Sequence, residues 1–389
     1  MGRTGTKTHE ILIVPGFMAD TYSEIEKSFV ELSERSSGGV SFVWLVPDKK
    51  SKFLQYKDPA NSSKLDEPLF VSHLRKKNIP YIQGNISKYN LVSNYILFSR
   101  VFRGRSIAAV YTHFGFERFW ATFFGKVFRK TTIWNEHWYS LGTRFVFFKR
   151  IFYKIFVDYF ISVSQFITDT LPSGSRVYTI HNAIEAVGEN EYTQADKDSL
   201  KEKLCLPKDK RTILMVAAFR PEKRHHLALT ICMEVLRGRS DVQFVFLGDG
   251  AGRCEFINGC KRLGIINNVS VPGHVLNTKN YYIVADACML TSHEEPFGYA
   301  VLEAMNYKKP IVTFASGGPK EIITNGIDGI LVPDGDVAKF SSMVLRLLDN
   351  GEYCRELGKN AFTKIQNTYS RSAWIERLGS VMFEITGYK

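Results

Sequence analysis

Short apolar runs alternate with segments of helical periodicity along the first half of the chain, beginning with the run at 10–14. Apolar runs bounded by polar turns are typical of buried strands, and apolar residues recurring every three or four positions are typical of amphipathic helices. Alternation of the two predicts a parallel sheet with helices on both faces. The predicted strands are 10–14, 40–45, 81–82, 107–111, 131–134 and 159–163, and the predicted helices are 22–34, 69–77, 88–102, 116–128 and 144–156.

The second half repeats this pattern after a charged connector at 189–210. We therefore predict an α/β fold of two Rossmann-like, doubly wound domains, spanning 1–185 and 186–369. The final segment, 370–389, has apolar residues at roughly helical spacing and is expected to close the first domain. Ligands of such domains bind at the carboxyl ends of the strands, so the site is expected in a cleft there. The strands predicted for the second domain are 212–217, 242–247, 269–271, 287–290, 310–314 and 329–332.

Length and composition are those of a soluble protein with two cores. The chain has 389 residues, of which 44% are hydrophobic and 23% are charged. No apolar run has the length of a membrane span, and 11–14 is too short for a signal-peptide core, so we expect a cytoplasmic location. The six cysteines all lie in the second half without CxxC spacing, which favours reduced thiols over disulfides or a zinc site.

The net charge of +12 is concentrated between residues 91 and 160, where eleven Lys and Arg face three acidic residues among many aromatic ones. Cations mixed with amphipathic rings could dock on an anionic membrane, which would place the protein at the inner face of that membrane. Equally, the aromatic residues could fill a core while the cations form a solvated face. Nucleic-acid binding uses similar residues, but no recognised nucleic-acid module is present.

The stretch 291–307 has the pattern of a ligand-binding turn between a strand and a helix. Pro296 should begin the helix, so the amides from Phe297 to Ala300 would lack intrahelical acceptors and could bind an anion. Gly298 would let that anion approach the backbone. Glu295 and Glu303 are better suited to accept hydrogen bonds from hydroxyls, which indicates a ligand with a central phosphate and polyols at both ends. Solvated loop and helix glutamates remain the alternative.

Four stretches of the second half, taken in order, resemble the donor-binding domain of retaining glycosyltransferases of family 4, which have the GT-B architecture. The resemblance covers roughly 212–369. Any one of the four stretches alone would be weak evidence for the family, but all four in the right order and spacing are specific. The stretches are 219–224 (FRPEKR), 246–250 (FLGDG), 292–305 with the E-x7-E motif formed by Glu295 and Glu303, and 316–329 with its GGxxE and DG elements.

The resemblance implies roles for these residues. Glu295 would bind the donor sugar, the amides from Phe297 to Tyr299 would meet sugar and phosphate, and Glu303 would hold the ribose. Lys223 and Arg220 would neutralise the diphosphate as it leaves, which agrees with the rule that preorganised cations best stabilise departing charge. Gly248 and Gly250 would form the family's GxG turn near the donor.

In the first half, the resemblance points to His137, which follows a strand where the family often has a histidine facing the donor sugar. His113 ends the preceding strand and is a second candidate, and a structural role is the alternative for each. The first strand is followed by a turn where the family usually has two glycines near the phosphates. Only Gly16 remains of that pair.

Metal and redox chemistry are disfavoured. Asp334 and Asp336 superficially form a DxD, but GT-B enzymes generally need no such metal, and the turn at 248–250 lacks the third glycine of a dinucleotide fingerprint. We therefore predict no cofactor beyond a nucleotide diphosphate sugar, which is a co-substrate. The function that the resemblance implies is retaining, metal-independent transfer of a hexosyl or N-acetylhexosaminyl group to a glycan or lipid-linked acceptor in cell-surface polysaccharide synthesis. A non-catalytic GT-B-like subunit that binds a partner glycosyltransferase is the alternative.

Overall fold

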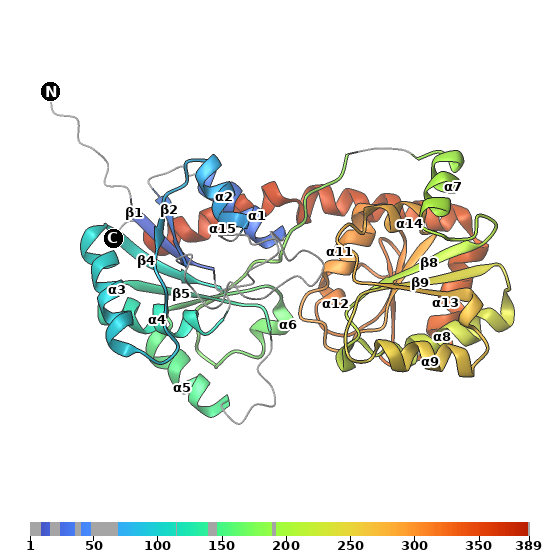
Figure 1. The fold of residues 1–389 in the computed structure, drawn as a ribbon, viewed down its shortest axis with the longest axis horizontal. Coiled ribbons are helices and arrows are strands. Elements are labelled where there is room, and N and C mark those ends of the chain that lie inside the picture. Colours follow the sequence, from blue (N-terminus) through green and yellow to red (C-terminus); the bar gives the residue numbers. More distant parts are fainter. Residues whose placement is uncertain are drawn as a thin grey trace. The chain divides into compact units, whose positions relative to one another are not determined.

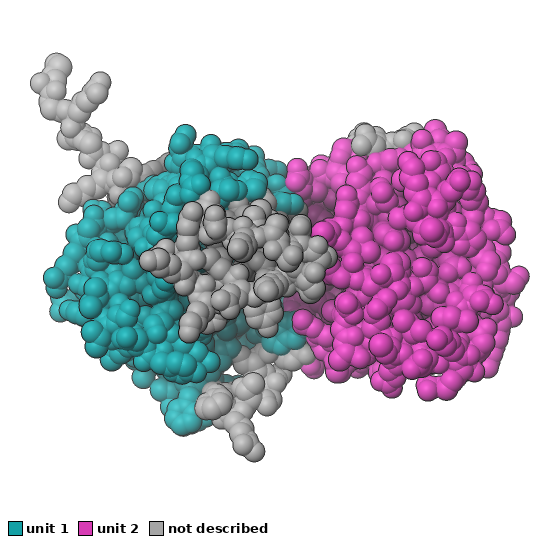
Figure 2. All heavy atoms as spheres, viewed as in Figure 1, with its two compact units in different colours: residues 1–183, 371–389 teal, residues 184–370 magenta. Residues whose placement is uncertain are grey.

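The protein is described by a computed structural model, which covers residues 9–15, 24–35, 40–47, 69–113, 115–138, 146–188 and 192–387. The chain divides into two compact units, Met1–Ala183 with Arg371–Lys389 and Ile184–Ser370 (Figure 2). These bounds lie within two residues of the predicted domain limits. No helix in the described ranges is long and apolar enough to cross a membrane.

The described part of the first unit builds a seven-stranded parallel sheet in the order β3-β2-β1-β4-β5-β6-β7 (Figure 1). Its strands are β1 (His9–Val14), β2 (Val40–Val46), β3 (Tyr81–Gln83), β4 (Ile107–Thr112), β5 (Thr131–Glu136), β6 (Tyr159–Ser162) and β7 (Val177–Thr179). Its helices are α1 (Glu24–Glu34), α2 (Leu69–Lys76), α3 (Leu91–Gly104), α4 (Glu117–Val127), α5 (Val146–Phe156), α6 (Gln165–Thr168) and α15 (Arg371–Thr386).

Helices cover both faces of this sheet, which explains why β1 reads as an apolar run from Ile11 to Val14. Ile11 and Ile13 of β1 point into a core shared with α1, α2 and α15. Leu12 and Val14 point the other way, into a core shared with α3 and α4. Strand side chains alternate between the faces, so each face receives every second residue of the run.

Helix α15 packs on the first unit although it follows the second unit in sequence. Its residues Trp374, Leu378 and Met382 are buried in the core on the α1 side of the sheet. The Trp374 ring meets the ring of Phe29 edge-on at 5.0 Å between centroids. The apolar spacing seen in the final segment of the sequence therefore forms one face of this helix.

The described part of the second unit builds a six-stranded parallel sheet in the order β10-β9-β8-β11-β12-β13. Both units thus have the predicted doubly wound α/β form. The strands are β8 (Arg211–Val216), β9 (Val242–Leu247), β10 (Val269–Gly273), β11 (Ala287–Leu290), β12 (Ile311–Phe314) and β13 (Ile330–Val332). The α-helices are α7 (Gln194–Lys203), α8 (His225–Gly238), α9 (Arg253–Arg262), α10 (Lys279–Val284), α11 (Tyr299–Asn306), α12 (Pro319–Ile322), α13 (Val337–Asp349) and α14 (Gly351–Lys364), and the shorter turns are η2 (Pro221–Lys223), η3 (Ile266–Asn268) and η4 (Ile365–Tyr369).

The predicted start of the helix at Pro296 is wrong. Helix α11 begins at Tyr299, and Gly298 is its N-cap with a φ of 118°. A side chain is strained at that backbone angle, so the position favours glycine. The segment from Pro296 to Gly298 is therefore an extension of the loop, and Phe297 is not part of the helix start.

Candidate functional site

The second sheet reverses its strand order between β8 and β11, and the loops that follow these two strands lie side by side. The hydroxyl of Thr291, after β11, donates to the carbonyl of Lys223, after β8, at 2.8 Å. The amide of His293 donates to the carbonyl of Glu222, also at 2.8 Å. Doubly wound sheets bind their ligands at such a reversal, so the two loops define the candidate site.

These loops bring two of the predicted catalytic residues together. The Nζ atom of Lys223 forms an ion pair with Oε2 of Glu295, and both side chains are mostly buried. Arg220, the second predicted cation, is exposed and forms no ion pair within the described ranges. Lys223 is therefore held in place by the protein, whereas the Arg220 side chain is open to solvent.

A third loop, which follows β12, supports the backbone of Glu295. A Cβ atom added to Gly317 would lie 2.2 Å from the Glu295 carbonyl oxygen, and one added to Gly318 would lie 2.4 Å from that of Phe297. The Gly318 amide donates to the Glu295 carbonyl at 2.7 Å. Two glycines thus let one loop lie directly on another, which fixes the position of Glu295.

Gly248 and Gly250, the predicted GxG turn after β9, have a similar role beside the Lys223 loop. Their φ angles are 141° and 149°. A Cβ atom on Gly248 would lie 2.1 Å from the Ala217 carbonyl oxygen, and one on Gly250 would lie 2.6 Å from that of Phe219. The structure therefore gives both glycines a packing function in positioning the loop of Lys223.

The remaining predicted donor-binding residues of this unit lie on or just before α11. Phe297 is buried in the unit, with its ring 5.7 Å from the ring of Tyr299, so only its backbone can meet a ligand. Glu303, in the middle of the helix, accepts a hydrogen bond at 2.8 Å from the hydroxyl of Tyr282. Burial, together with the Glu303 carboxylate, raises the pKa of Tyr282 well above its ordinary value. Tyr282, which the sequence did not single out, thus fixes the orientation of Glu303.

Asp334 and Asp336 are engaged by other side chains and backbone groups. Asp334 pairs with Arg224 at 2.8 Å and with Nδ1 of His293 at 3.0 Å. Asp336 caps α13 by accepting from the Lys339 amide at 2.9 Å. Within the described ranges, no group of three His, Cys, Asp or Glu residues could hold a metal ion. Sequence reasoning assigned no role to Arg224 or His293. The available signal for Arg224 was its place as the third basic residue of the loop 219–224, after Arg220 and Lys223.

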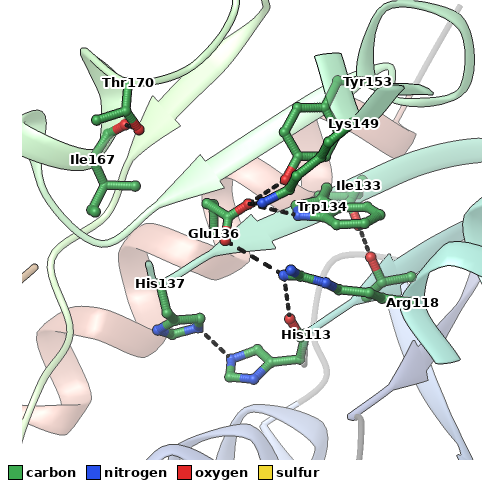
Figure 3. Close-up of polar contacts among 11 residues, drawn as sticks. His113, Arg118, Ile133, Trp134, Glu136, His137, Lys149, Tyr153, Ile167 and Thr170 are labelled. Atoms are coloured by element: carbon green, nitrogen blue, oxygen red, sulfur yellow. Dashed lines mark hydrogen bonds and ion pairs between the residues drawn. The ribbon is translucent and has the colours of Figure 1, made fainter. Parts of the chain in front are cut away.

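In the first unit, His113 follows β4 and His137 follows β5, and the two rings meet. Their Nε2 atoms are 2.9 Å apart (Figure 3). Burial lowers the pKa of His137 to about 3, and it holds the pKa of His113 well below its ordinary value. Both imidazoles are therefore neutral near pH 7, and one must donate to the other. Gly16 lies outside the described residues.

The residue before His137, Glu136, is the centre of a buried polar cluster (Figure 3). It accepts from Arg118 at 3.5 Å, Lys149 at 3.3 Å and the Trp134 indole at 3.2 Å, and also from the Tyr153 hydroxyl. Burial alone would raise the pKa of Glu136, but the two cations outweigh it and hold the pKa below its ordinary value. This cluster, also missed from the sequence, anchors the strand end that carries His137.

Solved glycosyltransferase structures share this fold over almost the whole chain. A glycosyltransferase from Rickettsia africae matches with a TM-score of 0.78 at 17% identity, covering 98% of this chain and 100% of its own. Anabaena HepE in complex with UDP matches with a TM-score of 0.75 at 15% identity, covering 96% of this chain and 100% of its own. The predicted GT-B fold is confirmed.

The likeness extends to sequence in the second unit, where residues 196–364 match the family model of glycosyl transferases group 1. N-acetyl-alpha-D-glucosaminyl L-malate synthase of Bacillus anthracis is 23% identical over 209 residues, 54% of each chain. Alpha-D-kanosaminyltransferase of Streptomyces kanamyceticus is 28% identical over 195 residues, 50% of each chain. This chain spans about half the length of the curated relatives it matches. Residues 196–364 are thus similar in sequence to group 1 glycosyl transferases, and the assignment to family 4 with its E-x7-E motif stays a prediction.

Proposed function

We propose that this protein transfers a sugar from a nucleotide diphosphate sugar to a hydroxyl acceptor. The observation that carries the proposal is the Lys223–Glu295 pair at the strand-order reversal of the second sheet, with Glu303 on the adjoining helix. One cation and two carboxylates at this position fit a ligand that has an anionic centre and hydroxyls on both sides. The match of this unit to glycosyl transferases group 1 supports the same substrate class.

In the proposed complex, the donor diphosphate replaces Glu295 as the partner of Lys223. Arg220, which is exposed, adds a second positive charge, and the amides from Phe297 to Tyr299 approach the sugar and phosphate. Charge develops on the diphosphate as the sugar departs, and fixed cations stabilise it there without a metal ion. Glu295, released from Lys223, then accepts a hydrogen bond from a sugar hydroxyl, while Glu303 holds the ribose.

Transfer is proposed to retain the anomeric configuration. The bond between the anomeric carbon and the phosphate oxygen breaks, the acceptor oxygen bonds to the same face, and the departing phosphate takes the acceptor proton. Glu295, Lys223, Arg220 and His137 are the proposed catalytic group. His137 would enter as a neutral imidazole able to hydrogen-bond a sugar hydroxyl, which is consistent with its lowered pKa.

The first unit is proposed to bind the acceptor, a glycan or a lipid-linked intermediate of cell-surface polysaccharide synthesis, at the inner face of the membrane. The transferred group is a hexosyl or N-acetylhexosaminyl residue. Names of similar proteins support this class, since they include a lipopolysaccharide core biosynthesis glycosyltransferase of Rhizobium meliloti and the Bacillus anthracis N-acetylglucosaminyl enzyme. Anabaena HepE was solved with UDP, which makes UDP-sugars the first donors to test.

The test is a transfer assay with the purified full chain, using the donor that stabilises it most in a thermal-shift panel of UDP-, GDP- and ADP-sugars. Lys223→Ala should lower the rate about 10²- to 10³-fold, the size expected for losing one group that stabilises developing charge. The matched control is Lys208→Ala, because Lys208 forms an exposed ion pair with Glu202. The anomeric configuration of the product, read by NMR, tests retention.

Binding of a donor with neither transfer nor hydrolysis would favour the non-catalytic subunit that binds a partner enzyme. Wild-type rates in Lys223→Ala would overturn the site assignment. Loss of activity on adding a chelator would contradict metal independence.

A further inference from the structure

Helices α3, α4 and α5 cover one face of the first sheet, opposite the face covered by α1, α2 and α15 (Figure 1). Their inner sides carry buried aromatic residues such as Phe98 and Phe124. Aromatic rings continue from α3 through α4 to α5, with Tyr95 near Phe128 and Phe123 near Phe156. Many aromatic residues of this layer therefore fill a core, but others lie on its outer, exposed side.

The outer side of α5 is apolar, the reverse of what a surface helix normally shows. Phe147 is 68% exposed, Phe148 66% and Ile155 58%, and Ile151 between them is also exposed. These positions form one stripe at helical spacing along the helix. The only exposed polar side chains of α5 in the described ranges are Arg150 and Lys154, which flank the stripe.

The start of α3 adds a second exposed apolar group on the same layer. Tyr89 is 85% exposed and Val92 is 67% exposed, and Leu91, Tyr95 and Ile96 beside them are exposed as well. Single exposed apolar residues are normal on a protein surface, but clusters of this kind mark interaction sites.

The charge of this layer has one sign. Glu117 is the only acidic residue of α3, α4 and α5, and it is buried. The exposed charged residues of these helices and of the positions next to their ends are all cations. They are Lys88, Arg100, Arg103, Arg129, Arg150 and Lys154. A partner for this surface must therefore accept apolar side chains and be negatively charged.

We propose that the outer face of α3, α4 and α5 docks on an anionic phospholipid bilayer. Phe147, Phe148, Ile151 and Ile155 would enter the boundary between headgroups and acyl chains, while the surrounding cations would bind lipid phosphates. A second copy of this chain fits less well, because two such faces would bring like charges together. The assignment is independent of the donor site, since none of these residues belongs to the proposed catalytic group.

The test is flotation of the purified full chain with vesicles of phosphatidylcholine, with or without phosphatidylglycerol, at physiological salt. The wild type should bind the phosphatidylglycerol vesicles and not the neutral ones. A variant with Phe147, Phe148, Ile151 and Ile155 changed to Ser should lose at least about tenfold in binding, because the apolar contact is gone. Arg150→Ser with Lys154→Ser should weaken binding less and reduce its salt dependence.

The matched control changes Leu276 and Ile327 to Ser, two exposed apolar residues of the second unit, and it should bind like the wild type. Transfer to a water-soluble acceptor should be unchanged in every one of these variants, which separates a failure of docking from a failure of the proposed activity. Wild-type vesicle binding by the four-serine variant would overturn the proposal. The proposal would also be overturned if the wild type did not bind anionic vesicles. That includes the outcomes in which this face forms a dimer or binds nucleic acid instead.

Discussion

The loops at the carboxyl ends of the two sheets are held by different kinds of contact. In the second unit, backbone lies on backbone at Gly248, Gly250, Gly317 and Gly318, where a side chain would collide with a carbonyl oxygen. In the first unit, a buried carboxylate, Glu136, ties its strand end to Arg118, Lys149 and two aromatic residues. Backbone contacts demand glycine at fixed positions, whereas a side-chain cluster can be built in several ways. This explains why the second unit has the recognisable motifs.

The largest effect on stability should come from Glu136→Ala. Removing this carboxylate leaves Arg118 and Lys149 buried without their shared partner, which should cost the first unit about 3–5 kcal/mol. All five tryptophans lie in the first unit, so tryptophan fluorescence during chemical unfolding reports on that unit. Glu34→Ala, which breaks an exposed pair with Lys77 in the same unit, should leave the curve unchanged. Equal unfolding curves for Glu136→Ala and the wild type would show that the Glu136 cluster does not stabilise the first unit.

Gly248→Ala should have a slightly smaller effect, on the second unit. The added methyl group must avoid the Ala217 carbonyl and adopt a left-handed backbone angle, which together should cost about 2–4 kcal/mol. Hydrogen exchange in β8 and β9 measures this loss. Gly264→Ala is the control, because Gly264 also has a positive φ, of 68°, but has open space around it. If the two substitutions destabilise the unit equally, backbone strain alone accounts for the effect and the loop contact does not.

Acid should weaken the first unit through its two histidines. The pKa values of His113 and His137 are lowered in the folded state, so the unfolded chain binds protons that the folded chain does not. Stability should therefore fall as the pH drops from about 6.5 towards about 3, the pKa of His137, and be independent of these groups above that window. A variant with His113 and His137 changed to Gln should have a flatter stability curve across this range. An unchanged slope would mean that other groups cause the acid sensitivity.

The smallest of these effects should come from Glu303→Ala, which leaves the fold intact. Losing a hydrogen bond between the ribose and a charged group should weaken nucleotide binding by about tenfold. Isothermal titration with the preferred nucleoside diphosphate measures this change. Tyr282→Phe, which removes the hydroxyl that orients Glu303 at 2.8 Å, should have a weaker effect in the same direction. Wild-type nucleotide affinity in Glu303→Ala would contradict the proposed hydrogen bond between the ribose and the Glu303 carboxylate.

Periodicity predicted every strand of the two sheets except the short edge strand β7, Val177–Thr179. Strands covered on both faces read as apolar runs, and β1, with Ile11 and Ile13 on one face and Leu12 and Val14 on the other, is such a case. The start of α11 could not be predicted in this way. Pro296 favours a helix start, but the contact of Gly318 with Phe297 holds the loop open as far as Gly298.

Contacts between side chains of distant loops also could not be predicted from the sequence. The Lys223–Glu295 pair joins residues that were each predicted, but their direct contact depends on how the loops after β8 and β11 pack. Tyr282, Arg224 and Glu136 were missed because their partners are far away in the chain. The periodicity of α5 predicted a helix, but aromatic residues on both of its sides concealed which one faces water.

The most direct test of the donor site is nucleotide affinity in Lys223→Ala and Glu295→Ala, measured by titration of the preferred nucleoside diphosphate. Lys223→Ala should bind about 10- to 100-fold more weakly, as expected for losing a charged hydrogen bond to phosphate. Glu295→Ala should bind at least as tightly as the wild type, because Lys223 is freed for the diphosphate, and yet should transfer sugar poorly. Wild-type nucleotide affinity in Lys223→Ala would contradict a diphosphate site at the junction of these two loops.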